Sequence, residues 1–146
     1  MMCRESNQAG GTRCCFSTEI RVCVGDLNYG NHLANDAVLR LAHEARIRWL
    51  TAHGIGESDI GGGVGLIMNR AEADYLAQAF HGDMLRTDCF VEQTGGSRFC
   101  FTAEFVRTAD GKTVARAVCH LLCFDYAKQK PARMPSEFAA LLAQNA

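Results

Sequence analysis

The sequence predicts a two-layer α+β domain in which an antiparallel sheet of five strands covers one long helix. Three observations carry this prediction. One segment, starting near residue 35, repeats apolar residues at three- and four-residue steps. Five other segments alternate or are continuously apolar over strand-like lengths, and glycine-containing turns separate the later ones. A chain of 146 residues with 48% hydrophobic content can build one core, so we expect a flexible tail over residues 1–13 and a single domain over residues 14–146.

The first half begins with a strand that leads into the helix. Residues 16–24 alternate, with Phe16, Thr18, Ile20, Val22 and Val24 on one face, and this pattern predicts a half-buried strand. The apolar residues between positions 37 and 50 follow the helical period, so one face of the helix is expected to be buried. Asn35 or Asp36 is expected to cap the helix start and Gly54 to mark its end.

The second half is expected to consist of strands. Residues 55–65 are Gly-rich, but no Gly-Lys-Ser/Thr sequence and no helix pattern follow, so we expect a flexible turn and not a phosphate-binding loop. Strands are predicted at residues 66–75, 84–93, 97–108 and 113–125, with hairpin signals between them. The last strand is apolar on both faces, which favours a central position. Ser136 is expected to cap a short C-terminal helix.

Composition narrows the function classes. The formal net charge is −1, with 15 basic and 16 acidic residues interspersed, which argues against nucleic acid or an anionic membrane as a partner. No apolar run approaches the length of a membrane span, and the polar N-terminal residues lack the apolar centre of a signal peptide. We therefore expect a cytoplasmic protein that binds small molecules or other proteins.

The eight cysteines raise the question of disulfides or a zinc site. Cys14 and Cys15 are adjacent, no C-x-x-C pair occurs, and Cys119 and Cys123 flank His120 at a spacing that is not repeated elsewhere. We expect the cysteines to be reduced, buried, small hydrophobic residues without a metal.

The most informative stretch is the loop between the first strand and the helix. Within eleven positions it holds six polar residues: Asp26, Asn28, Asn31, His32, Asn35 and Asp36. A plain turn needs two or three. A helix start leaves backbone N–H groups unpaired and carries the positive end of the helix dipole. The loop therefore delivers polar side chains beside a place that favours a developing negative charge.

Residues 25–46 read G-D-L-N-Y-G-N-H-L-A-N-D-A-V-L-R-L-A-H-E-A-R. This stretch resembles the signature of hotdog-fold thioesterases of the 4-hydroxybenzoyl-CoA thioesterase-like group, D-x-D-x-x-G-H-V-N-N-A-x-Y followed by E-E-A-R. Without a gap, Asp26, His32 and Asn35 match the first Asp, the His and the second Asn, and residues 44–46 match E-A-R. Asn28 stands where the family commonly has the Asp usually assigned to catalysis. Gly30 comes one place early, and Val38 replaces the Tyr.

The resemblance implies a hotdog fold and hydrolysis of an acyl thioester, carried by CoA or by an acyl-carrier protein, without a cofactor. It places the substrate carbonyl at the helix start and the pocket between two subunits. The strand expected near residues 65–75 would form an exposed sheet edge, so we expect a homodimer or a dimer of dimers.

The missing second Asp leaves two candidates for the general base, Asp26 and, slightly behind it, Glu44. Asn28 and His32 would then orient the water or the thioester. Candidate substrate-binding residues are Tyr29, Asn35 and Asp36. Structural roles remain alternatives, because Asp and Asn bond turn amides and Glu44 can face solvent beside Arg48 at i+4.

Two rival functions remain open. The run D-L-N…H is similar to the motif of the (R)-specific enoyl-CoA hydratases, roughly G-D-x-N-P-x-H-x-D, although the interval from Asp26 to His32 is one residue longer and Tyr29 replaces the Pro. The other rival is a non-catalytic module that binds acyl thioesters, because the second Asp is absent. An acyl-CoA panel with a free-thiol reagent separates hydrolysis, hydration and binding alone.

Overall fold

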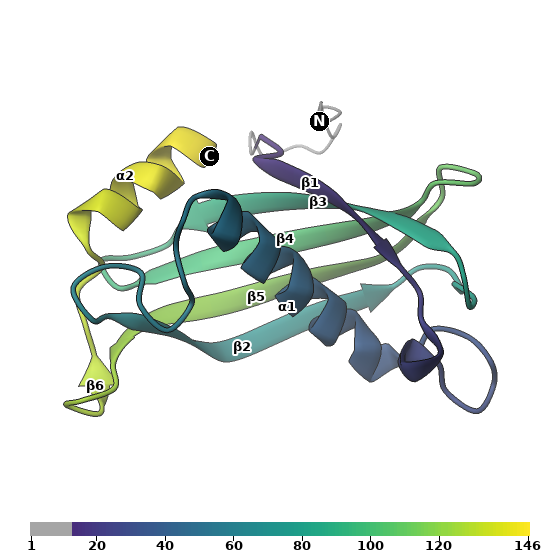
Figure 1. Ribbon diagram of the computed structural model, residues 1–146, viewed down its shortest axis with the longest axis horizontal. Helices are drawn as coiled ribbons and strands as arrows, with labels where there is room; N and C mark the ends of the chain where they lie inside the picture. The colour runs from purple at the N-terminus through teal and green to yellow at the C-terminus, as the bar shows by residue number, and fades with distance from the viewer. Residues whose placement is uncertain (1–12) are drawn as a thin grey trace.

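The computed structural model describes residues 13–146 as one six-stranded antiparallel sheet with two helices (Figure 1). The strands are β1 (Phe16–Arg21), β2 (Gly65–Tyr75), β3 (Met84–Gln93), β4 (Arg98–Arg107), β5 (Thr113–Asp125) and the two-residue β6 (Lys130–Pro131). Their order across the sheet is β1-β3-β4-β5-β2, with β6 paired to β5. The two-layer α+β prediction is confirmed, and β6 adds a short strand to the five expected.

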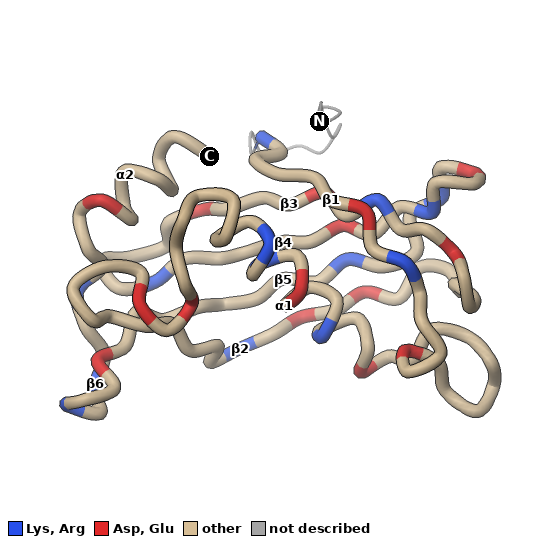
Figure 2. The backbone as a smooth tube through the Cα atoms, viewed as in Figure 1, with Lys and Arg blue, Asp and Glu red and all other residues tan. Residues whose placement is uncertain are grey.

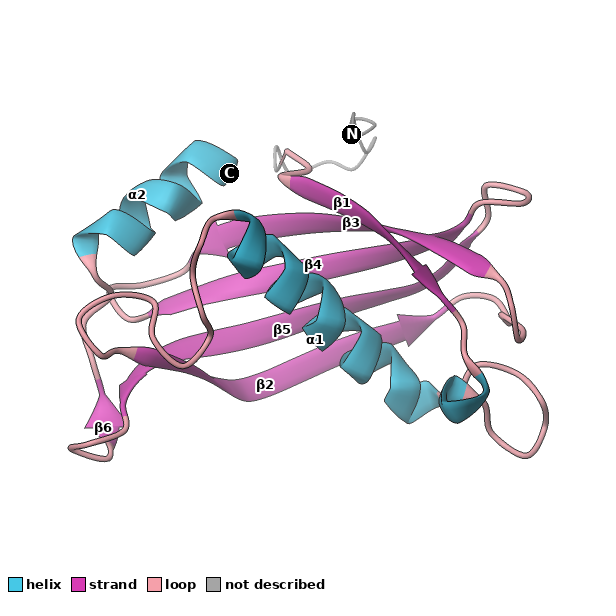
Figure 3. Ribbon diagram, in the orientation of Figure 1, coloured by secondary structure: helices cyan, strands magenta, loops and turns pink. Residues whose placement is uncertain are grey.

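The helix α1 (Asn35–Ala52) runs across one face of the sheet (Figure 3). Its buried residues keep the helical spacing seen in the sequence: Ala37, Val38, Leu41, Ala42, Ala45, Arg46, Trp49 and Leu50. Gly54 follows with φ +70°, the left-handed conformation that ends many helices. The capping prediction was wrong, because the N-cap is Ala34, and Asn35 and Asp36 already lie inside the first turn.

The sheet presents an apolar face to the helices and a more polar face away from them. On β4, Phe99, Phe101, Ala103 and Phe105 are fully buried, while the residues between them are half-buried. β5 lies between β4 and β2, as its two apolar faces predicted. β2 forms one edge, so its outer backbone groups have no neighbouring strand within the described chain. Acidic and basic residues are interspersed along the chain (Figure 2).

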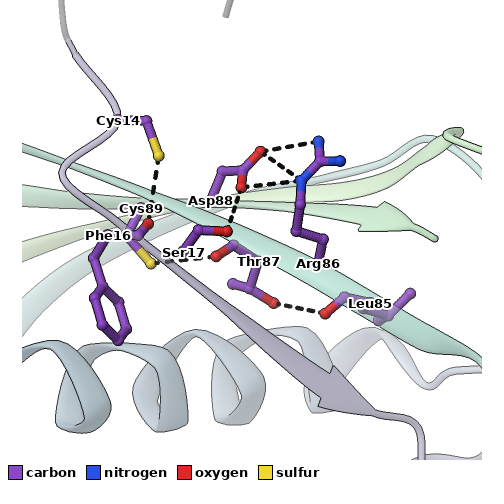
Figure 4. Close-up of polar contacts among 8 residues, drawn as sticks. All are labelled: Cys14, Phe16, Ser17, Leu85, Arg86, Thr87, Asp88 and Cys89. Carbon is purple, nitrogen blue, oxygen red and sulfur yellow. Dashed lines mark hydrogen bonds and ion pairs between the residues drawn. The ribbon is translucent and has the colours of Figure 1, made fainter. Parts of the chain in front are cut away.

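The other edge strand, β1, is fixed to β3 by a buried polar contact. Ser17 Oγ donates a hydrogen bond of 2.8 Å to Asp88 Oδ1, and the Arg86 guanidinium contacts both oxygens of the same carboxylate at 3.1 to 3.2 Å (Figure 4). Asp88 is 6% exposed, so its charge needs these partners. β1 ends at Arg21, earlier than the expected residue 24, because the chain turns there into the 3₁₀ helix η1 (Val24–Asp26).

The C-terminal helix α2 (Ser136–Asn145) packs on the same side of the sheet as α1. The Phe138 ring lies 5.2 Å from Phe99 and 6.3 Å from Trp49, measured between ring centroids. Its N-cap is Pro135 and not Ser136, which is the first helical residue. The expected tail lies outside the described residues except for Arg13, whose guanidinium donates to the Gln144 carbonyl at 2.8 Å. Among residues 13–146, no helix is long and apolar enough to cross a membrane.

The Gly-rich connection between α1 and β2 is anchored to the helix. Arg46 Nε lies 3.1 Å from Glu57 Oε2, and the Arg46 side chain is only 5% exposed. The guanidinium carbon also lies 5.9 Å from the centre of the Phe101 ring. Gly61, Gly62 and Gly63 all have positive φ, which explains the glycines between Ile60 and Val64.

Candidate active site

The loop from β1 to α1 is a compact, internally bonded structure. Leu27 and Leu33 form an antiparallel bridge, and the Asn28 N–H donates to the His32 carbonyl at 3.0 Å. Asn31 has φ +62°, a conformation that Asn tolerates better than most residues. These contacts bend the polar run back toward the start of α1.

A cavity of about 500 Å³ lies beside this loop, between the start of α1 and the end of the edge strand β2. It is lined by Asn28, His32, Leu33, Asn35, Val38, Tyr75, Leu76, Ala77, Gln78, Val114 and Ala115. Polar groups come from the loop and helix start, whereas Leu76, Ala77, Val114 and Ala115 supply an apolar wall. Such a mixed cavity suits a ligand with an apolar body and one polar reacting group.

Asn28 and His32 lie next to each other in the cavity wall. A Cβ atom added at Gly30 would lie 3.1 Å from Asn28 Oδ1 and 3.3 Å from His32 Nε2. Asn28 Oδ1 also accepts the Gly30 N–H at 2.9 Å. The absence of a side chain at Gly30 therefore lets the amide and the imidazole approach the same point.

The imidazole of His32 is oriented by the main chain. Its Nδ1 lies 3.3 Å from the Leu33 carbonyl oxygen, a contact that the Nδ1–H tautomer makes as a donor. In this tautomer Nε2 has its lone pair free to accept a proton.

The first turn of α1 forms a further part of the site. No side chain caps its N-terminus, and the Asn35 side chain accepts only the Asp36 N–H, at 2.9 Å. The phenol of Tyr75 donates to the Asn35 carbonyl at 3.1 Å and joins β2 to this turn. The positive end of the helix dipole thus lies at the cavity.

The other candidate residues from the sequence do not line the cavity. Asp26 Oδ2 accepts the Cys23 N–H at 2.9 Å and holds the η1 turn. Glu44 pairs with Arg48 at 3.0 Å, with half of its side chain exposed. Asp36 pairs with Arg40 at 2.9 Å, and Tyr29 is fully exposed at the loop tip.

Sequence reasoning missed the cavity residues contributed by the sheet. Tyr75 ends β2 and lies opposite Ala115 in the strand register, so the two close the same end of the cavity. Only the pairing of β2 with β5 brings residues 75–78 and 114–115 together. The one sequence signal that could have indicated this part of the cavity was Tyr75, an aromatic residue with a hydroxyl group at the end of a predicted edge strand.

In the described part of the chain, no group of three or more His, Cys, Asp or Glu side chains is arranged to hold a metal ion.

Comparisons with known proteins agree with this architecture. The family model of the thioesterase-like superfamily matches residues 22–142. A 1,4-dihydroxy-2-naphthoyl-CoA thioesterase from Synechocystis is 26% identical, with a TM-score of 0.81 over 91% of this chain and 96% of its own. Two further structures share the fold. One is a putative thioesterase from Prochlorococcus marinus (19% identity, TM-score 0.80, 91% and 97% coverage). The other is a putative thioesterase from Pseudomonas aeruginosa (20%, 0.78, 89% and 99%).

A comparison with curated protein sequences found no match. The family match nevertheless covers the polar loop, both cavity walls and α1. The resemblance found in the loop motif and the hotdog fold are confirmed. The chain belongs to the thioesterase-like superfamily, and its activity is the hydrolysis of a thioester.

Proposed function

We propose that the chain hydrolyses acyl-CoA thioesters in the cavity at the start of α1, with His32 as the general base. The observation that carries this proposal is the cavity itself, which combines an imidazole, a side-chain amide and the N-terminus of an 18-residue helix. Thioester hydrolysis needs a group that takes a proton from water and donors that meet the oxyanion.

His32 suits the role of base because its Nδ1 is held by the Leu33 carbonyl and its Nε2 remains to accept a proton from water. Asn28 cannot act as an acid or base, but its amide can orient that water or the thioester. The positive end of the α1 dipole would stabilise the oxyanion, and rotation of the Asn35 side chain would free the Asp36 N–H, which that side chain now accepts at 2.9 Å, to donate as well. The apolar wall would hold the acyl group.

Asp26 and Glu44 are the rivals for the base. The Asp26 carboxylate accepts a hydrogen bond from the Cys23 N–H at the start of the loop. We therefore assign Asp26 a positioning role: it holds the loop that carries Asn28 and His32. Glu44 is half exposed and paired with Arg48, so within one chain it faces solvent. It would reach a thioester only in the cavity of a partner subunit.

The cavity favours a short, ring-sized acyl group. Val38, Val114 and Ala115 are each 1% exposed and back directly onto the core, so within the described residues they close the apolar wall at this end of the cavity. The Synechocystis relative acts on a bicyclic aromatic CoA ester and is 26% identical to this chain. We therefore propose an aromatic acyl-CoA as the substrate class.

The assembly we propose is a homodimer or a dimer of dimers formed through the β2 edge. Tyr75 and Leu76 at the end of this strand are 57% and 58% exposed, and nearby Phe80, which bridges to His32, is 47% exposed. A second copy on this edge would cover these side chains and close the cavity mouth. A cytoplasmic location remains a prediction from the sequence.

An acyl-CoA panel read with a free-thiol reagent tests the activity. We expect benzoyl-CoA and naphthoyl-CoA to release CoA faster than palmitoyl-CoA, and faster than the same acyl groups on an acyl-carrier protein. Addition of water to an enoyl-CoA would instead support a hydratase. Tight binding without thiol release would support the non-catalytic module.

A further inference from the structure

A row of polar side chains crosses the face of the sheet that the helices leave uncovered. Cys100 on β4 lies opposite Glu92 on β3 and His120 on β5, and His120 lies opposite Arg70 on β2. Cys100 sits between Phe99 and Phe101, whose rings pack against the helices, so its side chain points to the other face. This row is separate from the cavity at the start of α1.

Four side chains of this face form a chain of contacts. Cys100 Sγ lies 3.3 Å from His120 Nδ1. His120 Nε2 lies 3.4 Å from Glu72 Oε1, and Arg70 contacts the same carboxylate oxygen at 2.6 Å. A nucleophile, a base and a carboxylate beside the other nitrogen of the base follow one another, which is the order of groups around an activated nucleophile. The contact between His120 and Glu72 is an ion-pair distance without hydrogen-bond geometry, so the carboxylate acts through its charge.

The geometry does not suit a metal ion, because Cys100 and Glu72 face opposite nitrogens of the imidazole ring.

The Cys100 thiol needs a base before its sulfur can act as a nucleophile. Burial raises the pKa of the Cys100 thiol, and the nearby charges of Glu92 and Glu72 raise it further, so the sulfur carries its proton near neutral pH. His120 is placed to take that proton, and the Glu72 carboxylate is placed to stabilise the imidazolium that results.

We propose that Cys100, His120 and Glu72 form a second reactive centre, in which the Cys100 thiol accepts acyl groups from acyl thioesters. The choice of acyl donor rests on the thioester hydrolysis proposed above, because those esters are the electrophiles that the protein meets. The reactive thiol itself rests only on the geometry of the outer face.

The proposed step is a thioester exchange. As the proton moves from Cys100 Sγ to His120 Nδ1, the sulfur attacks the carbonyl carbon of the acyl-CoA. A new carbon–sulfur bond forms, the bond to the CoA sulfur breaks, and the departing CoA thiolate takes the proton from His120. One thioester replaces another, so no oxidant, reductant or further reactant is consumed.

Cys23 provides an internal control within the same molecule. It is exposed, and its Sγ contacts the Arg21 carbonyl oxygen at 3.5 Å, a partner that cannot take a proton near neutral pH. Exposure alone would make Cys23 the faster thiol, because Cys100 is half-buried. Assistance by His120 reverses this order.

The first measurement is alkylation of the native protein by iodoacetamide, with the rate at each cysteine followed by peptide mapping and mass spectrometry. We expect Cys100 to react faster than Cys23. We also expect His120→Asn, which removes the base, to slow Cys100 about 10²-fold while leaving Cys23 unchanged. Equal or faster reaction of Cys23, or an unchanged Cys100 rate in His120→Asn, would overturn the proposal. Glu72→Gln should give an intermediate loss.

The second measurement uses benzoyl-CoA and detects the added acyl mass by peptide mapping. We expect acylation of Cys100 in the wild type and little in His120→Asn. Fast alkylation without acyl transfer would refute Cys100 as an acyl acceptor. The Cys100→Ser variant should hydrolyse benzoyl-CoA at the wild-type rate. Exchange at Cys100 releases at most one equivalent of CoA per chain. If no variant releases CoA over repeated turnovers, the proposed hydrolysis fails, whereas acylation of Cys100 is still read independently from the mass.

Discussion

Tyr75 Oη donates a hydrogen bond of 3.1 Å to the main-chain carbonyl of Asn35, and this bond joins the end of the edge strand β2 to the first turn of α1. Both residues line the cavity. Tyr126 makes a similar bond at the opposite end of the same strand, 2.8 Å to the Leu66 carbonyl. The two phenols thus offer a matched pair, one at the cavity and one away from it.

Replacing Tyr75 by Phe should raise KM for an aromatic acyl-CoA while largely retaining kcat. The phenol lies in the cavity wall and donates to a main-chain carbonyl, so it holds the shape of the site and takes no part in the proton transfer proposed for His32. Each lost bond should cost about 1 kcal/mol of folding free energy. Steady-state kinetics check this, with Tyr126→Phe as the control, in which KM should not change. Equal effects of both variants on KM would show that the bond at Tyr75 acts only through overall stability.

The ion pair between the buried Arg46 and the half-buried Glu57 should matter for stability much more than a surface pair does. Glu57→Gln leaves the nearly buried Arg46 guanidinium without its counter-charge, so we expect a loss of about 3 kcal/mol in the free energy of unfolding. Asp36→Asn breaks the exposed pair with Arg40 and should cost less than about 1 kcal/mol. Urea unfolding of both variants measures the difference, and similar losses would contradict it.

Cys123 predicts a loss of stability at alkaline pH. Burial raises the pKa of its thiol from 9.0 to about 11. Below the lower value both states keep the proton, so the folded state has its full stability. Between the two values the unfolded chain ionises and the folded protein does not, so the free energy of unfolding falls as pH rises.

The Cys123→Ala variant should therefore lose less stability than the wild type over this interval. The buried Cys119, whose pKa burial also raises, will keep part of the slope. Urea unfolding of the wild type and the variant at about pH 8 and about pH 10 measures how far the free energy of unfolding falls in each. Replacement of the exposed Cys23 by Ala is the control, and an equal flattening there would count against burial as the cause.

The exposed β2 edge predicts an oligomer in solution. Light scattering at micromolar concentration should give a dimer or tetramer mass, because a lone chain leaves the β2 backbone and the side chains of Tyr75 and Leu76 in water. A particle of 16.0 kDa, the mass of one chain, would contradict this prediction.

Much of the fold was predictable because it depends on local patterns. The period of the apolar residues from Ala37 to Leu50 marked the buried face of α1, and the apolar character of residues 113–125 marked a strand with a neighbour on each side. The cap was missed because Asn35 and Asp36 are both good capping residues, and the sequence does not show that Ala34 holds the cap backbone conformation.

The site was predictable only in part. The loop motif gave Asn28, His32 and Asn35, which the structure brings to one cavity. Tyr75, Val114 and Ala115 come from strands far away in the sequence, and only their register brings them there. For the same reason the contact of Cys100 with His120, twenty residues later, is invisible without the sheet. Contacts set by tertiary pairing have no local signature.

Single-turnover hydrolysis of an aromatic acyl-CoA by His32→Asn, Asp26→Asn and Glu44→Gln, each checked by melting temperature, tests the central claim most directly. We expect His32→Asn to lower the rate by about 10² to 10⁴ with substrate binding largely kept. Asp26→Asn should reduce stability more than rate, because its carboxylate holds the Cys23 N–H. Full turnover by His32→Asn, combined with loss of turnover in Asp26→Asn or Glu44→Gln, would contradict the account. The carboxylate whose replacement abolished turnover would then be the base.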